Sequence, residues 1–144
     1  MIVIDVNILV AAFFGDHARH KPAVAFLNRA VTSLGPAIVP DVVWSGFARV
    51  VTTPGLLDPT PAWPDVRAYI EKIRSHPGHA RSVRALDADL DVFLELSERS
   101  DARRNIVSDA YIAAIALANA CPVGTFDRDF RRFDGVEVIV PGQG

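Results

Sequence analysis

The chain has little of what exported, disulfide-bonded or membrane proteins require. Its one cysteine, Cys121, cannot form an internal disulfide or supply a zinc site by itself. No stretch approaches the roughly 18 uninterrupted apolar residues of a spanning helix, and no basic segment of the kind that opens a signal peptide precedes the first apolar run. These absences predict a cytoplasmic protein with no membrane partner, in which Cys121 is a core thiol.

Neither sign of charge is in large excess. Fifteen basic and 17 acidic residues give a net charge of −2, which excludes the global positive field common in nucleic-acid-binding proteins. Only two of the basic residues are lysines, and the other thirteen are arginines. A surface for an acidic partner would therefore have to be local. A GC-rich genome is the first explanation of the arginine excess, although the planar guanidinium also suits phosphate.

The length and the apolar content predict one domain over residues 1–144. A chain of 144 residues with 50% hydrophobic content can bury one sizeable core. The proline-rich stretch 53–64 is predicted to be a loop inside this domain, because the segments on either side are too small to fold alone.

Short apolar β-branched runs alternate with helical periods along the chain. The strands are predicted at 2–4, 37–40, 122–125 and 136–140. The helices are predicted at 17–34, 41–51 with Asp41 as the cap, 64–76, 87–99 and 106–120, with a short helix after Asp127. This alternation predicts an α/β sandwich with a mostly parallel sheet.

Two of the predicted helices differ in how they are expected to bury their apolar residues. Helix 87–99 is expected to turn Leu86, Leu90, Phe93 and Leu94 inward. Helix 106–120 is apolar almost all round and is predicted to be a buried helix.

Asp109 lies near the start of helix 106–120, where a carboxylate needs either a cation or several donors. Favourable interaction with the helix dipole is the alternative explanation.

Asp5 and Asp127 each follow a predicted strand. The carboxyl ends of parallel strands meet at one sheet edge, where ligands bind in such folds. Each aspartate has a simpler explanation as a helix cap, an Asx turn or the partner of a nearby arginine. Together with Asp109, however, they form three sequence-distant carboxylates whose repulsion a divalent cation would relieve. Mg²⁺ prefers such oxygen ligands and shares its coordination with phosphate, and Mn²⁺ can replace it.

Three short segments carry a resemblance to a known family. They read IVIDVN at residues 2–7, VSDAYIAA at 107–114 and TFDRDF at 125–130. In this order and at these separations, the chain resembles the PIN-domain ribonucleases, and among them the VapC-type toxins of toxin-antitoxin pairs. The resemblance spans essentially the whole chain and implies a PIN-like three-layer α/β/α sandwich.

The resemblance also implies roles for particular residues. Asp5, Asp109 and Asp127 would be the catalytic, metal-binding acids, Asn7 and Thr125 polar neighbours that orient them, and Asp129 a supporting carboxylate. The implied activity is a Mg²⁺-dependent endoribonuclease that cuts RNA with a metal-activated water. The implied partners are a VapB-type antitoxin of a type II pair and a second copy of the chain in a homodimer.

One position departs from the family pattern. The family commonly has a glutamate in the helix after the second strand, where this chain has Ser45 and Gly46. The site is therefore expected to hold one metal loosely, to bind it only with RNA, or to use Asp41 or Asp129 instead.

Other interpretations remain open at this stage. An aspartate-nucleophile phosphatase would also place an acid after the first strand, although its second acid is replaced by Asn7. A catalytically impaired, RNA-binding PIN domain is the third class.

His17 and His20 are spaced to share a helix face but lack further zinc ligands, so surface positions or an RNA contact are expected. Arginines at 103, 104, 128, 131 and 132 are expected to frame the acids.

Overall fold

A four-stranded parallel sheet forms the centre of the molecule in the computed structural model, which describes residues 1–78 and 90–143. The strand order is β2-β1-β3-β4. The strands are β1 (Ile2–Ile4), β2 (Ala37–Ile38), β3 (Val123–Gly124) and β4 (Val138–Ile139). Their positions confirm the four predicted strands, although three of them are shorter than predicted because only two residues of each join the ladder.

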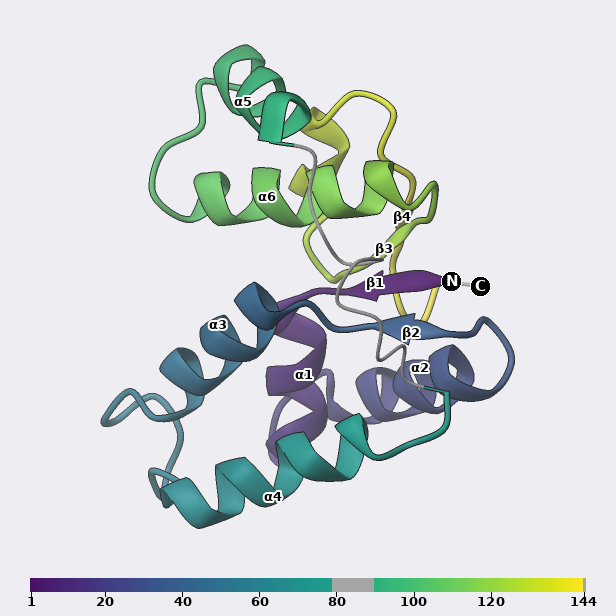
Figure 1. Ribbon diagram of the computed structural model, residues 1–144. Coiled ribbons are helices and arrows are strands. Elements are labelled where there is room, and N and C mark those ends of the chain that lie inside the picture. Colours follow the sequence, from purple (N-terminus) through teal and green to yellow (C-terminus); the bar gives the residue numbers. More distant parts are fainter. Residues whose placement is uncertain (79–89, 144) are drawn as a thin grey trace.

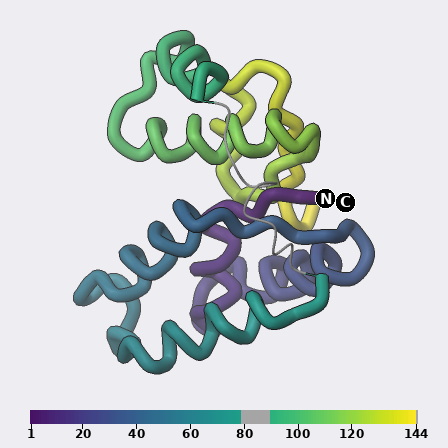
Figure 2. Tube along the Cα trace, viewed as in Figure 1, coloured from purple at the N-terminus to yellow at the C-terminus, as the bar shows by residue number. Residues whose placement is uncertain are grey.

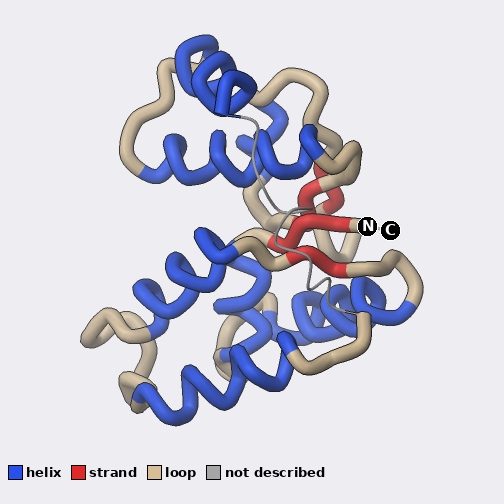
Figure 3. The backbone as a smooth tube through the Cα atoms, viewed as in Figure 1, coloured by secondary structure: helices blue, strands red, loops and turns tan. Residues whose placement is uncertain are grey.

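Helices cover both faces of this sheet (Figures 1 and 3). One face carries α1 (Val6–Phe13), α2 (His20–Thr32), α3 (Asp41–Val51) and α4 (Trp63–Arg74). The other carries α5 (Leu90–Arg99) and α6 (Asn105–Ala118), and a short 3-10 helix, η2 (Arg128–Arg132), follows β3. These three layers confirm the predicted α/β/α sandwich.

The core consists of β1 and the helix faces that pack on it. All three residues of β1 are buried, as the apolar run predicts. On one side, Phe47 of α3 makes edge contacts with Phe13 and packs near Tyr69. On the other, α6 buries four alanines and two isoleucines, which confirms the predicted buried helix. Small side chains let this helix approach the sheet closely.

Helix α1 was not among the predicted helices. Its sequence, VNILVAAF, is apolar on nearly every side, so it shows little of the amphipathic period by which helices are recognised. The helix forms because Asp5 caps it: the Val6 backbone N–H donates to Asp5 Oδ1 over 2.7 Å. The first strand therefore passes directly into a helix at the carboxylate.

Two other helix starts differ from the prediction. Helix α2 begins at His20, because residues 17–19 form a turn in which Arg19 N–H donates to His17 Nδ1. Helix α3 is capped by Pro40, and Asp41 is its first helical residue with no capping hydrogen bond from its side chain, so the predicted cap at Asp41 was wrong.

The expected inward face of α5 was right for Phe93 and wrong for Leu90 and Leu94. Leu90 and Leu94 are 61% and 54% exposed. The helix instead packs on α6 through Leu96, which is buried, and Phe93, whose ring contacts Tyr111. Apolar residues occur on two faces of this helix, and sequence period alone could not select between them. Leu86, and residues 87–89 of the predicted helix, lie outside the described residues.

In the described ranges, 1–78 and 90–143, no helix combines the length and the apolar character that crossing a lipid bilayer demands.

Candidate active site

The sheet has a topological switch point between β1 and β3. From β1 the chain moves to β2 on one side and later returns to β3 on the other (Figure 2). Ligands in open parallel sheets bind beyond the carboxyl ends of the two strands at such a point. Here those ends are Asp5, which follows β1, and Thr125, which follows β3. Fold topology therefore brings these two residues to one edge, 120 positions apart in sequence.

Asp5 is a buried carboxylate that only accepts hydrogen bonds. It is 4% exposed. Its Oδ2 accepts from Thr125 Oγ1 over 2.6 Å and from Asn7 Nδ2 over 3.0 Å, while Oδ1 accepts from the Val6 amide. Burial raises the pKa of Asp5, and the donors from Thr125 and Val6 oppose this rise. Three donors aimed at one carboxyl group match its ionised form.

Asn7 and Thr125 connect this carboxylate to the chain beyond β3. Asn7 Oδ1 accepts from the Phe126 backbone N–H over 3.1 Å, which fixes the orientation of its amide. Thr125 Oγ1 accepts from the Asp127 backbone N–H over 2.9 Å. The two ends of the chain are therefore held in one polar network, and Asp127 is placed by the residue that contacts Asp5.

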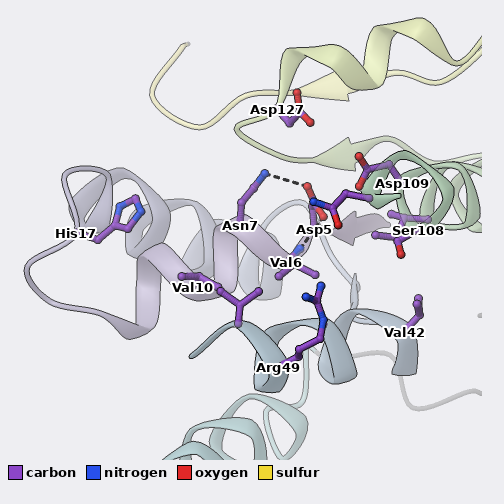
Figure 4. A pocket seen from close by; sticks show the side chains of 14 residues that line it. Asp5, Val6, Asn7, Val10, His17, Val42, Arg49, Ser108, Asp109 and Asp127 are labelled. Atoms are coloured by element: carbon purple, nitrogen blue, oxygen red, sulfur yellow. Dashed lines mark hydrogen bonds between the residues drawn. The ribbon is translucent and has the colours of Figure 1, made fainter. Parts of the chain in front are cut away.

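A pocket of about 340 Å³ lies over this network, and Asp5, Asp109 and Asp127 all line it (Figure 4). The structure thus brings together the three acids identified from the sequence. Asp129 and Asp41 are exposed and are not among its lining residues. Asp129 pairs with Arg132 at 3.3 Å, and its backbone N–H donates to Asp127 Oδ1.

Asp109 is a second carboxyl group of the pocket with a raised pKa. Burial, together with the charges of Asp5 and Asp127, raises its pKa to about 7, while Arg132 partly opposes the shift. Asp109 is the fifth residue of α6, beyond the first turn in which the helix dipole acts. The dipole therefore does not account for a carboxylate here, and the raised pKa of Asp109 comes first from burial and then from the neighbouring acids.

Three pocket residues were missed by the sequence analysis. Asn105 and Ser108 of α6 line the pocket with Asp109. Asn105 lies four residues before Asp109, about one helical turn away, and Ser108 directly precedes it. Polar residues grouped on one side of an otherwise apolar helix were the available signal. Arg49 of α3 also lines the pocket, and its side chain extends from α3 toward the acids (Figure 4). It brings a positive charge to a site that otherwise carries three acids.

Gly46 lines the pocket and is one of the two residues that stand where the family commonly has a glutamate. A Cβ atom at this position would lie 2.9 Å from Val6 Cγ2, so any side chain requires Val6 to move. Ser45 is exposed and does not line the pocket. This helix therefore contributes Arg49 to the site and no carboxylate.

The two histidines do not share a site. His20 Nδ1 donates to the Ala11 carbonyl over 2.9 Å and so ties α2 to α1. His17 lines the pocket beyond Asn7. Of the arginines expected to frame the acids, Arg132 lowers the pKa of Asp109, whereas Arg103 pairs with Asp101.

The donor set fits a cation that is shared with a ligand better than a complete protein cage. Over residues 1–78 and 90–143, no three His, Cys, Asp or Glu side chains stand together as a ready metal site. Mg²⁺ is commonly held by one or two carboxylates, waters and a substrate phosphate. Asp5, Asp109 and Asp127 around one open pocket suit that arrangement.

Replacing Thr125 with valine is expected to destabilise the fold. Valine matches the shape of threonine but leaves Asp5, Asn7 and the Asp127 amide without their hydroxyl partner. Unsatisfied buried groups of this kind cost about 1–3 kcal/mol. The midpoint of urea unfolding should fall by a corresponding amount, with little change in the m-value.

Thr125→Ser is the matched control, because it keeps the hydroxyl and loses only a methyl group. It should stay closer to the wild-type midpoint than the valine variant. Equal stability of the two variants would show that the hydroxyl network contributes nothing.

Comparison with known proteins places the chain among characterised relatives. The family model described as "PIN domain" matches residues 2–136. Ribonuclease VapC25 of Mycobacterium tuberculosis is 33% identical over 98% of this chain and 99% of its own length. Ribonuclease VapC31 of the same species is 31% identical over the same shares of the two chains.

Solved structures share the fold. The VapBC2 structure from Rickettsia felis, bound to a DNA fragment from its promoter, contains a chain that matches with a TM-score of 0.68 and 16% identity, covering 98% of this chain and 99% of that one. FitAcB from Neisseria gonorrhoeae matches with a TM-score of 0.63 and 18% identity, covering 96% of each chain. With a family model over residues 2–136 and full-length relatives above 30% identity, the chain belongs to the PIN domain family and, within it, to the VapC group.

Proposed function

We propose that the protein is a Mg²⁺-dependent endoribonuclease that acts as the toxin of a type II toxin-antitoxin pair. The observation that carries this proposal is the convergence of Asp5, Asp109 and Asp127 on one open pocket at the switch point of the sheet. The relatives named as VapC ribonucleases support the same activity.

The pocket residues have separable tasks in this reaction. A divalent cation held by Asp5, Asp109 and Asp127 would neutralise a phosphate oxygen and lower the pKa of a water molecule, with Mn²⁺ able to replace Mg²⁺. Thr125, Asn7 and the Val6 amide donate to Asp5, which orients its carboxyl group for the cation. Arg49 supplies a fixed positive charge for the RNA backbone on the α3 side.

The partners follow from the same proposal. The Rickettsia felis structure is a VapBC assembly, and a VapB-type antitoxin is the corresponding partner of this chain. A homodimer remains a prediction of the family resemblance. Binding of a co-expressed antitoxin should inhibit RNA cleavage by the purified complex.

Cleavage of RNA with and without divalent cations tests the activity. Full-length protein should cut RNA with Mg²⁺ or Mn²⁺, and excess EDTA should abolish cutting reversibly. An end-labelled RNA distinguishes internal cuts from trimming at the ends.

The other outcomes identify the competing functions. RNA binding without cleavage under any cation would indicate the impaired binding domain. Phosphate release from a small phosphoester with a trapped aspartyl-phosphate would indicate the phosphatase. The position two residues after Asp5, where such a phosphatase has its second acid, is Asn7 in this chain.

A further inference from the structure

A second hollow adjoins the acid pocket and is not used by the proposed chemistry. It has a volume of about 380 Å³, within the range of sites for small ligands, about 300–1,000 Å³. Asn7, His17 and Asp127 line both hollows, so the two share a wall. The remaining lining residues of the second are Arg19 and Phe126. Anything bound there would lie directly beside the acids.

Arg19 and Phe126 contact each other in this hollow. The guanidinium carbon of Arg19 lies over the Phe126 ring, 4.9 Å from its centroid. The ring in turn packs against Ala11, Ala12 and Ala23 of α1 and α2. Phe126 is therefore supported from within the protein, and it lies beneath the guanidinium of the exposed Arg19, which is planar by its own chemistry.

His17 and Arg19 are fixed relative to each other and to the pocket. Arg19 N–H donates to His17 Nδ1 over 3.0 Å, so a neutral His17 ring carries its proton on Nε2 and can donate from there. Over residues 1–78 and 90–143, no carboxylate forms an ion pair with Arg19. Its charge and its outer face are therefore available to a ligand.

We propose that this hollow is a nucleobase subsite, in which an unpaired base of the RNA stacks on the Arg19 guanidinium that Phe126 supports. The inference rests on the proposed RNA-cleaving function and names the part of the substrate held next to the cut. Protein side chains recognise RNA mainly through unpaired bases stacked on aromatic rings or arginine planes. The shared wall at Asn7 and Asp127 places the stacked nucleotide beside the phosphate at the acids.

The subsite requires an unpaired base. A base within a duplex has both faces covered by its neighbours and cannot reach the Arg19 plane. Because every base has a π face, stacking alone gives affinity with little sequence preference. Any preference for one base would come from the edge that meets His17.

Binding of hexauridylate in the presence of EDTA tests the subsite without cleavage. Arg19→Ala should weaken binding about 5- to 100-fold, the range for losing one stacked base. Arg19→Lys keeps the charge but lacks the plane, so it should bind nearly as weakly as the alanine variant. Arg29→Ala removes an exposed arginine of α2 outside both hollows and should bind like the wild type.

Hexamers with one abasic residue at each position in turn give a second readout. One position should weaken wild-type binding by a factor similar to that of Arg19→Ala, and the abasic residue should add little to the alanine variant. Wild-type affinity in Arg19→Lys, no sensitive position, or no binding of hexauridylate would overturn the subsite. Absence of Mg²⁺-dependent cleavage would overturn the proposed function and leave this binding result intact.

Discussion

RNA cleavage by the Asp109→Asn variant is expected to fall about 10²- to 10³-fold, the cost typical of removing one electrostatic contact that stabilises developing charge. Asp109 lines the pocket with Asp5 and Asp127 and belongs to no recorded side-chain hydrogen bond of the described residues. Asparagine keeps its shape and removes its charge. The loss should appear in initial cleavage rates at saturating Mg²⁺.

Asp65→Asn is the matched control for this variant. Asp65 is an exposed aspartate near the start of α4 and does not line the pocket. The same change of charge there should leave the cleavage rate within about twofold, since surface substitutions rarely matter. Wild-type cleavage by Asp109→Asn would remove Asp109 from the metal site.

The same Asp109→Asn substitution is expected to stabilise the metal-free protein at alkaline pH. The pKa of Asp109 is raised to about 7 by burial and by the neighbouring acids, from an ordinary value of 3.8. The folded state therefore binds this proton more tightly than the unfolded state. The ionised carboxylate destabilises the fold, and this penalty grows as pH rises from about 4 to about 7 and is complete above that range.

Because the carboxyl group is partly exposed and screened, a gain of about 1–2 kcal/mol is expected at about pH 8, corresponding to about 3–8 °C in Tm. The difference in stability between variant and wild type should shrink as pH falls and disappear only below about pH 4, where the carboxyl group is protonated in both the folded and the unfolded state. Thermal unfolding in EDTA at several pH values measures it. Excess Mg²⁺ should reduce this difference in stability, because it stabilises the wild type more than the variant. A difference in stability that does not depend on pH would contradict the charge argument.

The fold was largely predictable because strands and most helices have local signals. Buried strands such as 2–4 are short β-branched runs, and their alternation with helices implies a parallel sheet. Helix α1 was missed because its residues are apolar on all sides and only the cap at Asp5 marks its start. The buried face of α5 depends on what α6 presents to it, which no local pattern contains.

The site was predictable only where it is tied to strand ends. Asp5 and Asp127 follow strands, so the parallel sheet alone implied that they would meet. Arg49 comes from a helix whose rotation about its own axis decides whether it points at the pocket or at solvent, and Asn105 depends similarly on α6. Asp41 and Asp129 were considered as site residues because they lie near pocket residues in the sequence. Neither of them lines the pocket.

The bond between Asp5 and Thr125 imposes an order of events on protein synthesis. Asp5 leaves the ribosome before its hydroxyl partner and Asp127, which follow 120 or more positions later. A growing polypeptide therefore has no assembled acid pocket until the segment around Asp127 has been made and has folded against the first strand.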